Sequence, residues 1–504
     1  MEIQVAVIDF GSQYSQLIVR RVRELGYFAK LYRPQDLRDI GTPTSVILSG
    51  GPRSVTENGA PDIDFEYLQQ MHVPILGICY GMQLLNLKQG GSVAPSHSRE
   101  YGPADLLPCV TEGLLAGISA KSQIWMSHSD TVSDLSTDTK ILAKNQHDVP
   151  VALQWNERLL GIQFHPEVTH SHEGTKVLNN FLKLSGDPPR FEIQSFRDDM
   201  IQSLKERVGD SEVICGVSGG VDSTVLAVLL QRAEVKVRPI FVDQGLLRKD
   251  EGDEVERNFE LLGVPIERVN VADQFLTALS GLTDPEEKRR CIGDLFINVF
   301  WNTAKDVPLL AQGTLYPDVI ESATSGSDAS RIKTHHNRVD RILELQEEGR
   351  VIEPLAELFK DEVRALGESL DIPKDLLYRH PFPGPGLAVR IPGEVTERKL
   401  EIVREADAIF IGKLREHGWY DQVWQAYAAL IPVKTVGVKG DERSYEYAIS
   451  LRAVISEDAM TADWVELPYP LLREASNQIL NTVTGVNRVF FDISTKPPAS
   501  IELE

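Results

Sequence analysis

Short apolar runs that end in glycine-containing turns recur along this chain, and they restrict the folds that the chain can adopt. The runs Ile3–Phe10, Ser45–Leu48 and Val73–Ile78 are apolar on both faces and rich in β-branched residues. That pattern is typical of strands buried within a parallel sheet. Amphipathic segments of helical length lie between the runs, and the alternation predicts an α/β fold for the N-terminal part of the chain.

A cluster of helix-breaking residues, Ser185-Gly-Asp-Pro-Pro-Arg190, marks the end of this first region. A second α/β region follows it. We expect its strands and its first helix, in chain order, at Glu212–Val217, Val221–Arg232 (the helix), Val237–Val242 and Val307–Gly313.

The segment His380–Gly386 is so rich in Pro and Gly that it predicts a rigid connector to a third region. There, apolar residues recur at period two from Tyr445 to Ile455, which indicates a half-buried antiparallel strand. A helix at Leu471–Leu480 and a strand at Arg488–Ile493 complete it. The predicted fold class is α/β: two open parallel-sheet α/β domains, 1–187 and 188–385, followed by a small α+β domain, 386–504.

The net charge of −22, from 52 Lys and Arg against 74 Asp and Glu, argues against a protein that holds a long nucleic acid by its phosphates. No run of about 18 apolar residues is present, so no membrane span is expected. The start of the chain, MEIQVAVIDFGSQ, shows neither the basic segment nor the cleavage site of a signal peptide. The four cysteines are far apart, so we expect a cytoplasmic protein with reduced thiols.

Cys79 stands at a turn between the strand Val73–Ile78 and a helical pattern, with Gly77 and Gly81 two residues away on either side. Small neighbours relieve the crowding around a nucleophile on a strained strand-to-helix turn, and a helix N-terminus favours a thiolate. Because a free thiol is mostly protonated at pH 7, a base is also needed. His165, followed two residues later by Glu167, offers that base and a carboxylate to orient it.

Three separated motifs, Ser49–Pro52, Cys79–Gln83 and His165–Glu167, resemble the class I (triad) glutamine amidotransferases in order and spacing. The resemblance implies that Cys79 attacks the side-chain amide of glutamine, and that His165 protonates the departing ammonia and then activates water. By the same resemblance, the oxyanion hole consists of backbone N–H groups of Gly51 and Tyr80. The residues that would bind glutamine are Gln83, Ser127 and His128.

A second turn, Ser218–Thr224, lies between the strand Glu212–Val217 and its following helix. Its two glycines expose N–H groups beside a helix N-terminus, which makes an anion cradle. No lysine follows the glycines, so the loop is not of the Walker A type. Asp222 would repel a bare phosphate, and a Mg²⁺ ion between the two removes that conflict.

This loop closely resembles the nucleotide loop of the N-type ATP pyrophosphatases, which adenylate a carbonyl-type oxygen and release pyrophosphate. The resemblance implies ATP and Mg²⁺, with Asp222 at the metal. The implied ATP-binding residues are Ser218, Gly219, Gly220, Val221, Asp222, Ser223, Val242, Gly313 and Lys360. Lys360 and the His335–Asn337 loop would belong to a lid over the ATP site.

Further segments along essentially the whole chain resemble the glutamine-hydrolysing GMP synthase family, among them His380–Arg390 and Thr495–Glu502. The resemblance implies amination of xanthosine 5′-monophosphate (XMP), with ATP and glutamine as the other substrates, and a homodimer formed by the last domain. The residues implied to contact XMP are Arg289, Gln425, Lys496, Ile501 and Glu502. The basic run Lys288–Arg290 is a candidate phosphate grip, although such a run is more often a solvated surface.

Two other interpretations compete with this one. An RNA-thiolating enzyme could carry the same phosphate loop, but it usually needs a basic RNA-binding face, and the acidity and the Cys79 turn argue against it. A binding or regulatory protein without activity could be built on the same folds. The presence of Cys79, His165, Glu167 and Asp222 argues against that interpretation. Neither nucleic acid nor membrane is an expected partner.

Overall fold

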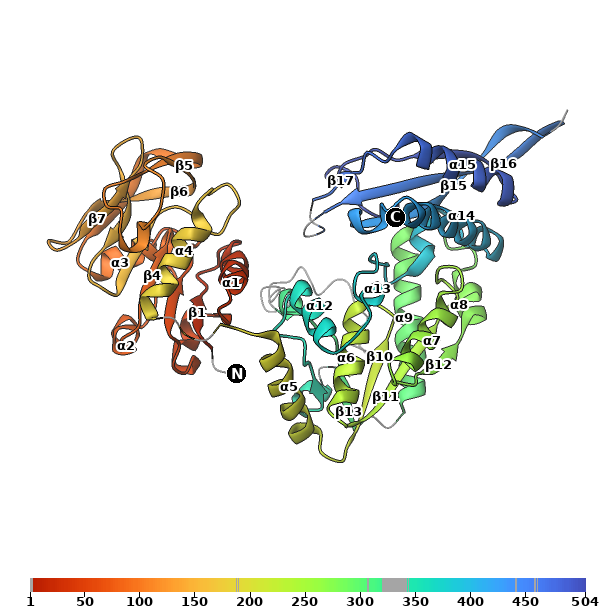
Figure 1. Cartoon of the computed structure of the whole chain (residues 1–504), viewed down its shortest axis with the longest axis horizontal. Coiled ribbons are helices and arrows are strands. Elements are labelled where there is room, and N and C mark those ends of the chain that lie inside the picture. Colours follow the sequence, from red (N-terminus) through yellow and green to blue (C-terminus); the bar gives the residue numbers. More distant parts are fainter. Residues whose placement is uncertain are drawn as a thin grey trace. The chain divides into compact units, whose positions relative to one another are not determined.

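The computed structural model describes residues 3–186, 188, 190–305, 308–319, 342, 344–439, 442–456, 459 and 461–504. The chain divides into two compact units, Met1–Phe196 and Arg197–Glu504 (Figure 1). The finer domain boundaries after residues 187 and 385 stay predictions. In the described part of the chain, no helix combines the length and the apolar character needed to cross a membrane.

The first unit is built on a nine-stranded sheet with the order β2-β1-β3-β4-β9-β8-β7-β5-β6. The strands from β2 to β9 in this order are parallel, and each later pairing is antiparallel. The predicted parallel sheet is therefore confirmed and continues into an antiparallel half. The strands are β1 (Val5–Ile8), β2 (Ala29–Tyr32), β3 (Ser45–Leu48), β4 (Ile75–Ile78), β5 (Ser92–Pro108), β6 (Ser122–Asp134), β7 (Lys140–Lys144), β8 (Pro150–Gln154) and β9 (Leu159–Ile162).

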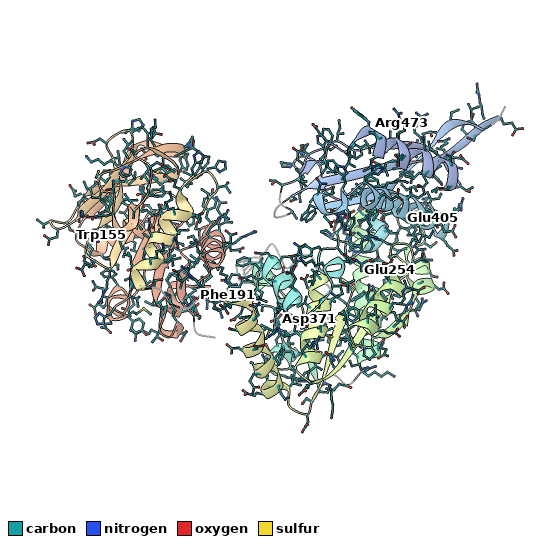
Figure 2. The ribbon with its side chains drawn as sticks, in the orientation of Figure 1. Trp155, Phe191, Glu254, Asp371, Glu405 and Arg473 are labelled. Atoms are coloured by element: carbon teal, nitrogen blue, oxygen red, sulfur yellow. The ribbon has the colours of Figure 1, made fainter. Side chains whose placement is uncertain are left out.

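Helices and a buried apolar cluster complete the first unit. Trp155, marked in Figure 2, belongs to this cluster and is only 7% exposed. The helices are α1 (Ser15–Glu24), α2 (Phe65–Gln70), α3 (Tyr80–Lys88) and α4 (Gly174–Leu182), with short 3₁₀ turns at Pro34–Asp39, Gly113–Leu115 and Lys183–Ser185; α5 (Ile193–Val208) spans the division between the units.

The second unit begins with a parallel sheet of order β12-β11-β10-β13-β14. Helix α6 packs on β10 and β11, and α9 packs on β11, as Figure 1 shows in yellow and green. The elements are β10 (Glu212–Val217), α6 (Val221–Arg232), β11 (Lys236–Asp243), α7 (Glu251–Leu261), β12 (Glu267–Asn270), α8 (Ala272–Leu279), α9 (Pro285–Ala304), β13 (Leu309–Ala311), β14 (Val351–Ile352), α12 (Lys360–Ser369) and α13 (Lys374–Leu377).

The remainder of the second unit is a small antiparallel sheet, β15-β16-β17, with β18 added parallel to β16. The predicted strand, helix and final strand are confirmed within two to three residues at their ends. One apolar core runs from Ile240 of the parallel sheet through Leu387 to Phe410 and Leu451. The elements are a 3₁₀ turn at Gly386–Arg390, α14 (Glu397–Glu416), a 3₁₀ turn at Tyr420–Gln422, β15 (Gln425–Lys439), β16 (Glu442–Ile455), β17 (Asp463–Trp464), α15 (Tyr469–Thr482) and β18 (Val486–Phe491).

Lys288, on α9, is completely buried instead of lying on a solvated surface. Its ammonium donates to the carbonyl oxygens of Ala388, Ile391 and Gly393 at 3.2, 2.9 and 3.1 Å, and it pairs with the carboxylate of Glu504. An ammonium with these partners is not free to grip a phosphate, so that interpretation of Lys288 is wrong. The side chain instead ties the end of the chain to α9.

Replacing Lys288 by Met should lower the free energy of unfolding of the second unit by about 3–5 kcal/mol, because it leaves a buried carboxylate without its cation. The neighbouring Arg289 is 40% exposed and pairs with Glu286 of its own helix. Arg289→Met is the matched control and should change stability by less than about 0.5 kcal/mol. Denaturant titration of both variants measures the difference; equal losses would contradict the buried role of Lys288.

Candidate active sites

Cys79 occupies a strained turn between β4 and α3, with backbone angles φ 52° and ψ −103°. A left-handed backbone at a non-glycine residue is uncommon and persists only where the surroundings hold it. A Cβ atom on Gly77 would lie 2.5 Å from the carbonyl carbon of Gly81, so the turn leaves no room for a larger residue there. The predicted elbow is thus present, and Cys79 stands at the start of α3, where backbone N–H groups lack helical partners.

His165 lies beside Cys79, and Glu167 lies behind His165. The Nδ1 atom of His165 and the Oε1 atom of Glu167 are 2.7 Å apart, and both residues are almost fully buried. Burial alone lowers the pKa of His165, but the Glu167 carboxylate and a hydrogen bond with Cys79 outweigh it and raise the pKa well above its usual value. This arrangement stabilises an imidazolium beside the sulfur, and it fits a nucleophile, base and orienting carboxylate.

Gln163 is a neighbour of the sulfur that the sequence interpretation did not include. Its side-chain amide donates to Sγ of Cys79 at 3.6 Å and accepts from the Gln83 amide at 3.3 Å. Gln83 also donates to the carbonyl of Asp130 at 2.9 Å, so its amide is already engaged by the protein. The position of Gln163, directly after β9 and two residues before His165, was the available signal.

A cavity of about 530 Å³ opens in front of Cys79. Seven of the eight predicted residues of this site line it, and the eighth, Glu167, is reached only through His165. The ring of His128 is buried and donates from Nδ1 to the Asp130 carbonyl, 2.8 Å away. Burial lowers the pKa of His128, which favours a neutral ring beside a polar ligand. The seven are Gly51, Cys79, Tyr80, Gln83, Ser127, His128 and His165.

The second predicted site begins where β10 ends. The loop Ser218–Gly220 is held by Ser223 of α6. The Ser223 hydroxyl accepts from the Ser218 N–H at 3.1 Å and donates to the Gly220 carbonyl at 3.1 Å. Gly219 has φ +75°, and a Cβ atom there would lie 2.5 Å from Val255 of α7. The side-chain hydrogen bonds thus stiffen a glycine turn at the N-terminus of α6, where an anion is favoured.

Asp222 lies in the first turn of α6, and its Oδ2 atom pairs with Nζ of Lys360 at 2.5 Å. The other oxygen, Oδ1, is buried without a hydrogen-bond partner. Gly313 lies against the same residue, since a Cβ atom there would be 3.6 Å from Cβ of Asp222. One free carboxylate oxygen beside a phosphate cradle fits Mg²⁺, which commonly takes one or two carboxylates and completes its shell with phosphates and water.

The side chains of Val242 and Lys496 are both engaged within the protein, each in a different way. The Val242 side chain is 4% exposed and belongs to the apolar core, so only its backbone can face a nucleotide. Lys496 donates from Nζ to the Ala459 carbonyl at 2.8 Å, and its backbone pairs with Ala462.

Glu502 and Gln425 meet in the second unit. The Glu502 carboxylate is held at 3.1 Å by both Nε and one terminal nitrogen of Arg390, and it accepts from the Gln425 amide at 2.6 Å. Ile501 precedes it, and its carbonyl accepts from the Tyr427 hydroxyl at 2.8 Å. Arg289 is directed instead to Glu286 of its own helix. The predicted lid loop His335–Asn337 lies outside the described residues.

The chain matches three family patterns and many full-length proteins. The patterns are "Glutamine amidotransferase class-I" over residues 6–184, "tRNA methyl transferase HUP domain" over 211–281 and "GMP synthase C terminal domain" over 412–503. A protein of Thermosipho melanesiensis described as "GMP synthase [glutamine-hydrolyzing]" is 49% identical over 99% of each chain. Proteins with the same description are 48% identical in Carboxydothermus hydrogenoformans, over 100% of each chain, and in Aquifex aeolicus, over 99% of each chain.

Replacing Glu167 by Gln should lower the pKa of His165, because burial then acts without the opposing carboxylate. His165 should therefore lose its proton at a lower pH in the variant than in the native protein. Histidine NMR of selectively labelled protein, assigned with a His165→Gln variant, measures the titration. Glu57→Gln, at an exposed carboxylate that lines the same cavity, is the control and should leave the titration in place. An unchanged titration in Glu167→Gln would contradict the assigned role of Glu167.

Proposed function

The chain belongs to the glutamine-hydrolysing GMP synthases, and from that premise we propose how its residues divide the reaction. The enzyme makes GMP from XMP at the expense of ATP, with glutamine as the nitrogen donor. One set of residues produces ammonia, and the other activates the oxygen that ammonia replaces. The contact between His165 and Glu167 beside Cys79 carries the first assignment.

In the first half, the Cys79 thiolate attacks the carboxamide carbon of glutamine and forms a tetrahedral intermediate. The N–H groups of Gly51 and Tyr80 stabilise its oxyanion, and His165 donates a proton to the departing ammonia. Water, deprotonated by His165, then cleaves the glutamyl thioester and releases glutamate. Glu167 keeps the ring of His165 in one orientation throughout.

The residues around the cavity complete this half-reaction. Ser127 and His128 hold the glutamine backbone, in agreement with their place in the lining of the cavity. Gln83, which the sequence assigned to glutamine, supports Gln163 behind the sulfur as well. We therefore propose that Gln163 keeps the Cys79 sulfur in place for attack.

In the second half, the loop from Ser218 to Ser223 cradles the ATP phosphates, with Lys360 beside it and Gly313 and the Val242 backbone along the nucleotide. Asp222 would hold Mg²⁺ through its free Oδ1 atom. The bound ion supplies positive charge that offsets the negative charge of the leaving pyrophosphate. The 2-oxygen of XMP attacks the α-phosphorus, and the bond to pyrophosphate breaks. Ammonia then adds at C2 and displaces AMP.

We propose that XMP is held by Glu502, Gln425, Lys496, Ile501 and Arg289. The strongest support is the fixed position of Glu502, which is bound at both oxygens. Arg289 is exposed enough to leave Glu286 for a phosphate. The enzyme is proposed to work in the cytoplasm, where a reducing environment suits its four free cysteines.

The competing RNA-modifying function is favoured only by the pattern match over residues 211–281. That match covers the phosphate-loop region, whereas the GMP synthases align over the whole chain. The shared region is therefore explained by a shared nucleotide-binding fold.

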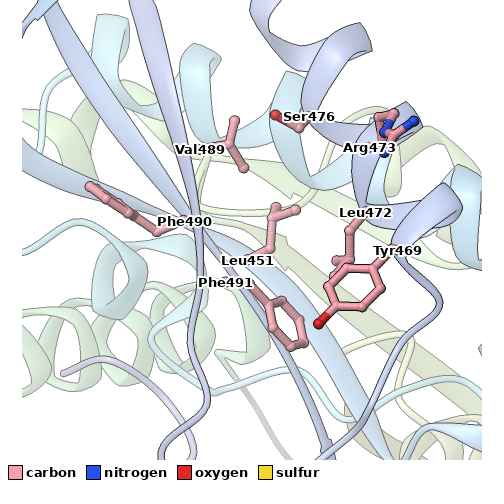
Figure 3. Close-up of a pocket in the computed structure, with 8 residues that line it drawn as sticks. All are labelled: Leu451, Tyr469, Leu472, Arg473, Ser476, Val489, Phe490 and Phe491. Atoms are coloured by element: carbon pink, nitrogen blue, oxygen red, sulfur yellow. The ribbon is translucent and has the colours of Figure 1, made fainter.

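We further propose that two copies associate through the C-terminal part of the chain. A hollow of about 300 Å³ between α15 and β18 is lined mainly by apolar side chains (Figure 3). Tyr469 is 84% exposed and Phe490 is 47% exposed at its border. A second copy of this chain is the occupant that fits, because the matched family pattern covers this region and the apolar side chains would be covered in a dimer.

Replacing Cys79 by Ala should abolish GMP formation from glutamine and leave formation from ammonium salts within about twofold of the native rate, because the second site keeps all its residues. The two activities are measured by GMP release with glutamine or with ammonium chloride at alkaline pH. Loss of both activities in a folded variant would contradict the division of labour.

Pyrophosphate release from ATP should require both XMP and Mg²⁺, and chelation of the metal should remove it. Asp222→Asn should reduce the rate by about 10²-fold or more, because it weakens the metal site and the cradle together. A pyrophosphate assay with XMP, inosine monophosphate and tRNA tests the assignment. Equal rates with inosine monophosphate or tRNA would show that XMP is not the acceptor.

Tyr469→Asp should shift the protein from dimer to monomer, since a charge in the covered hollow opposes association. Leu261→Asp is the control, because Leu261 is 86% exposed on α7, outside the C-terminal part. Sedimentation velocity measures both. A Tyr469→Asp variant that stays dimeric would place the interface elsewhere.

A further inference from the structure

Six charged side chains of alternating sign connect the glycine loop to the C-terminal carboxylate within the second unit. The chain of contacts starts at the carbonyl of Gly219, which accepts from Arg379 at 3.5 Å. It ends at the Glu502 carboxylate. We call these six side chains the charge row; in order, they are Arg379, Glu251, Arg248, Asp407, Arg390 and Glu502. None of the four between Arg379 and Glu502 was assigned a function from the sequence.

The half near the glycine loop joins α7 to the segment before the connector. Arg379 binds Oε1 of Glu251 at 2.9 Å, and Glu251 is the first residue of α7. The other oxygen of Glu251 accepts from the backbone N–H of Arg248 at 3.0 Å. Because Gly219 also packs against Val255 of α7, the loop and the charges rest on the same helix.

The half near the tail is more deeply buried. Asp407, on α14, lies 3.8 Å from Nε of Arg248 and 3.5 Å from a terminal nitrogen of Arg390, and it accepts from the Ala428 N–H at 3.0 Å. Arg390 is fully buried, with its guanidinium 4.4 Å from the centre of the Tyr427 ring. Its two-pronged contact then fixes the Glu502 carboxylate.

Because the charges alternate in sign along the row, a side chain at one end cannot easily move while the others stay in place. Three cations and three anions balance, and each interior charge faces an opposite charge on either side. Moving one of them away would deprive each buried neighbour of one of its opposite charges, which is unfavourable. A displacement of Glu502 is therefore transmitted along the row instead of being absorbed by water.

The first contact also fixes the direction of a loop N–H group. The peptide unit between Gly219 and Gly220 is planar, so its N–H points away from its carbonyl. Arg379 holds that carbonyl, and the N–H of Gly220 is directed to the opposite side of the peptide, where it donates to the Ser218 hydroxyl at 3.3 Å. The charge row thus helps to fix the Ser218–Gly220 turn that forms the anion cradle.

We propose that Arg379, Glu251, Arg248, Asp407 and Arg390 are positioning residues that couple the ATP loop to Glu502, so that binding of either nucleotide strengthens binding of the other. The proposal rests on the assignment of ATP to the loop and of XMP to Glu502. The coupling aligns the two reacting atoms only when both nucleotides are present. By linkage, the factor by which an ATP analogue tightens XMP binding equals the factor by which XMP tightens binding of the analogue.

The coupling factor is measured by calorimetric titration of the full-length protein with XMP, in the absence and presence of Mg²⁺ and saturating α,β-methylene-ATP. We expect the analogue to tighten XMP binding in the native protein by about tenfold, a usual size for coupled sites. Asp407→Asn and Glu251→Gln should each reduce the factor to less than about twofold. Because the factor is a ratio within one variant, loss of stability alone does not change it.

Glu405→Gln is the matched control. Glu405 lies two residues before Asp407 on the same helix and is marked in Figure 2, but it is 48% exposed and pairs with Lys249 outside the charge row. Its replacement should leave the factor unchanged. If Asp407→Asn does not fold, Glu251→Gln decides the matter alone, because it breaks the row at the other end.

Glu502→Gln separates the two possible failures. If this variant binds XMP as tightly as the native protein, the assignment of XMP to Glu502 is wrong. If it binds XMP more weakly while Asp407→Asn and Glu251→Gln keep the native coupling factor, the coupling proposal alone is overturned.

Discussion

Both candidate sites depend on one constraint: a central strand of a parallel sheet must end in a turn so tight that only small residues fit around it. In the first unit, β4 lies between β3 and β9 and leads into Cys79. In the second, β10 lies between β11 and β13 and leads into the loop at Ser218. Buried neighbours on both sides hold each strand, so they also hold the turn. Gly77 and Gly219 allow the close approach of chain segments, around Cys79 in one case and around the proposed phosphate loop in the other.

Local patterns predicted these turns because every feature that forms them lies within a few residues. In each turn, a strand that is apolar on both faces is followed directly by the small residues and then by the helix. His165 and Glu167 are likewise close enough in sequence to face each other. The antiparallel half of the first sheet was not predicted, since the sequence of strands such as β5 mixes polar and apolar residues and lacks the continuous apolar run. Gln163 was missed because its role depends on how the strand end approaches the Cys79 sulfur.

Charge was the feature least open to prediction. Lys288 stands in a basic run whose most common position is the surface, yet it is fully buried and bound to three carbonyl oxygens. Arg390 and Asp407 are 17 residues apart in sequence, and the other carboxylate that Arg390 binds, Glu502, lies near the end of the chain. Which charges pair is decided by tertiary packing, and no local pattern records it. The acidic composition is thus compatible with phosphate chemistry. In the proposed sites, glycine backbone and a few cations would contact the nucleotides, and several carboxylates hold buried cations in place.

The chemistry that unites the two sites is the replacement of an oxygen by nitrogen after that oxygen has been attached to phosphorus. Ammonia displaces AMP only if the 2-oxygen of XMP has first attacked the α-phosphorus of ATP, a step that we assign to the proposed cradle at Ser218. The direct measurement uses XMP labelled with ¹⁸O at C2, followed by mass spectrometry of the products. The account predicts that the label appears in the phosphate group of AMP and is absent from pyrophosphate. Label released into water or found in pyrophosphate would contradict the proposed adenylation.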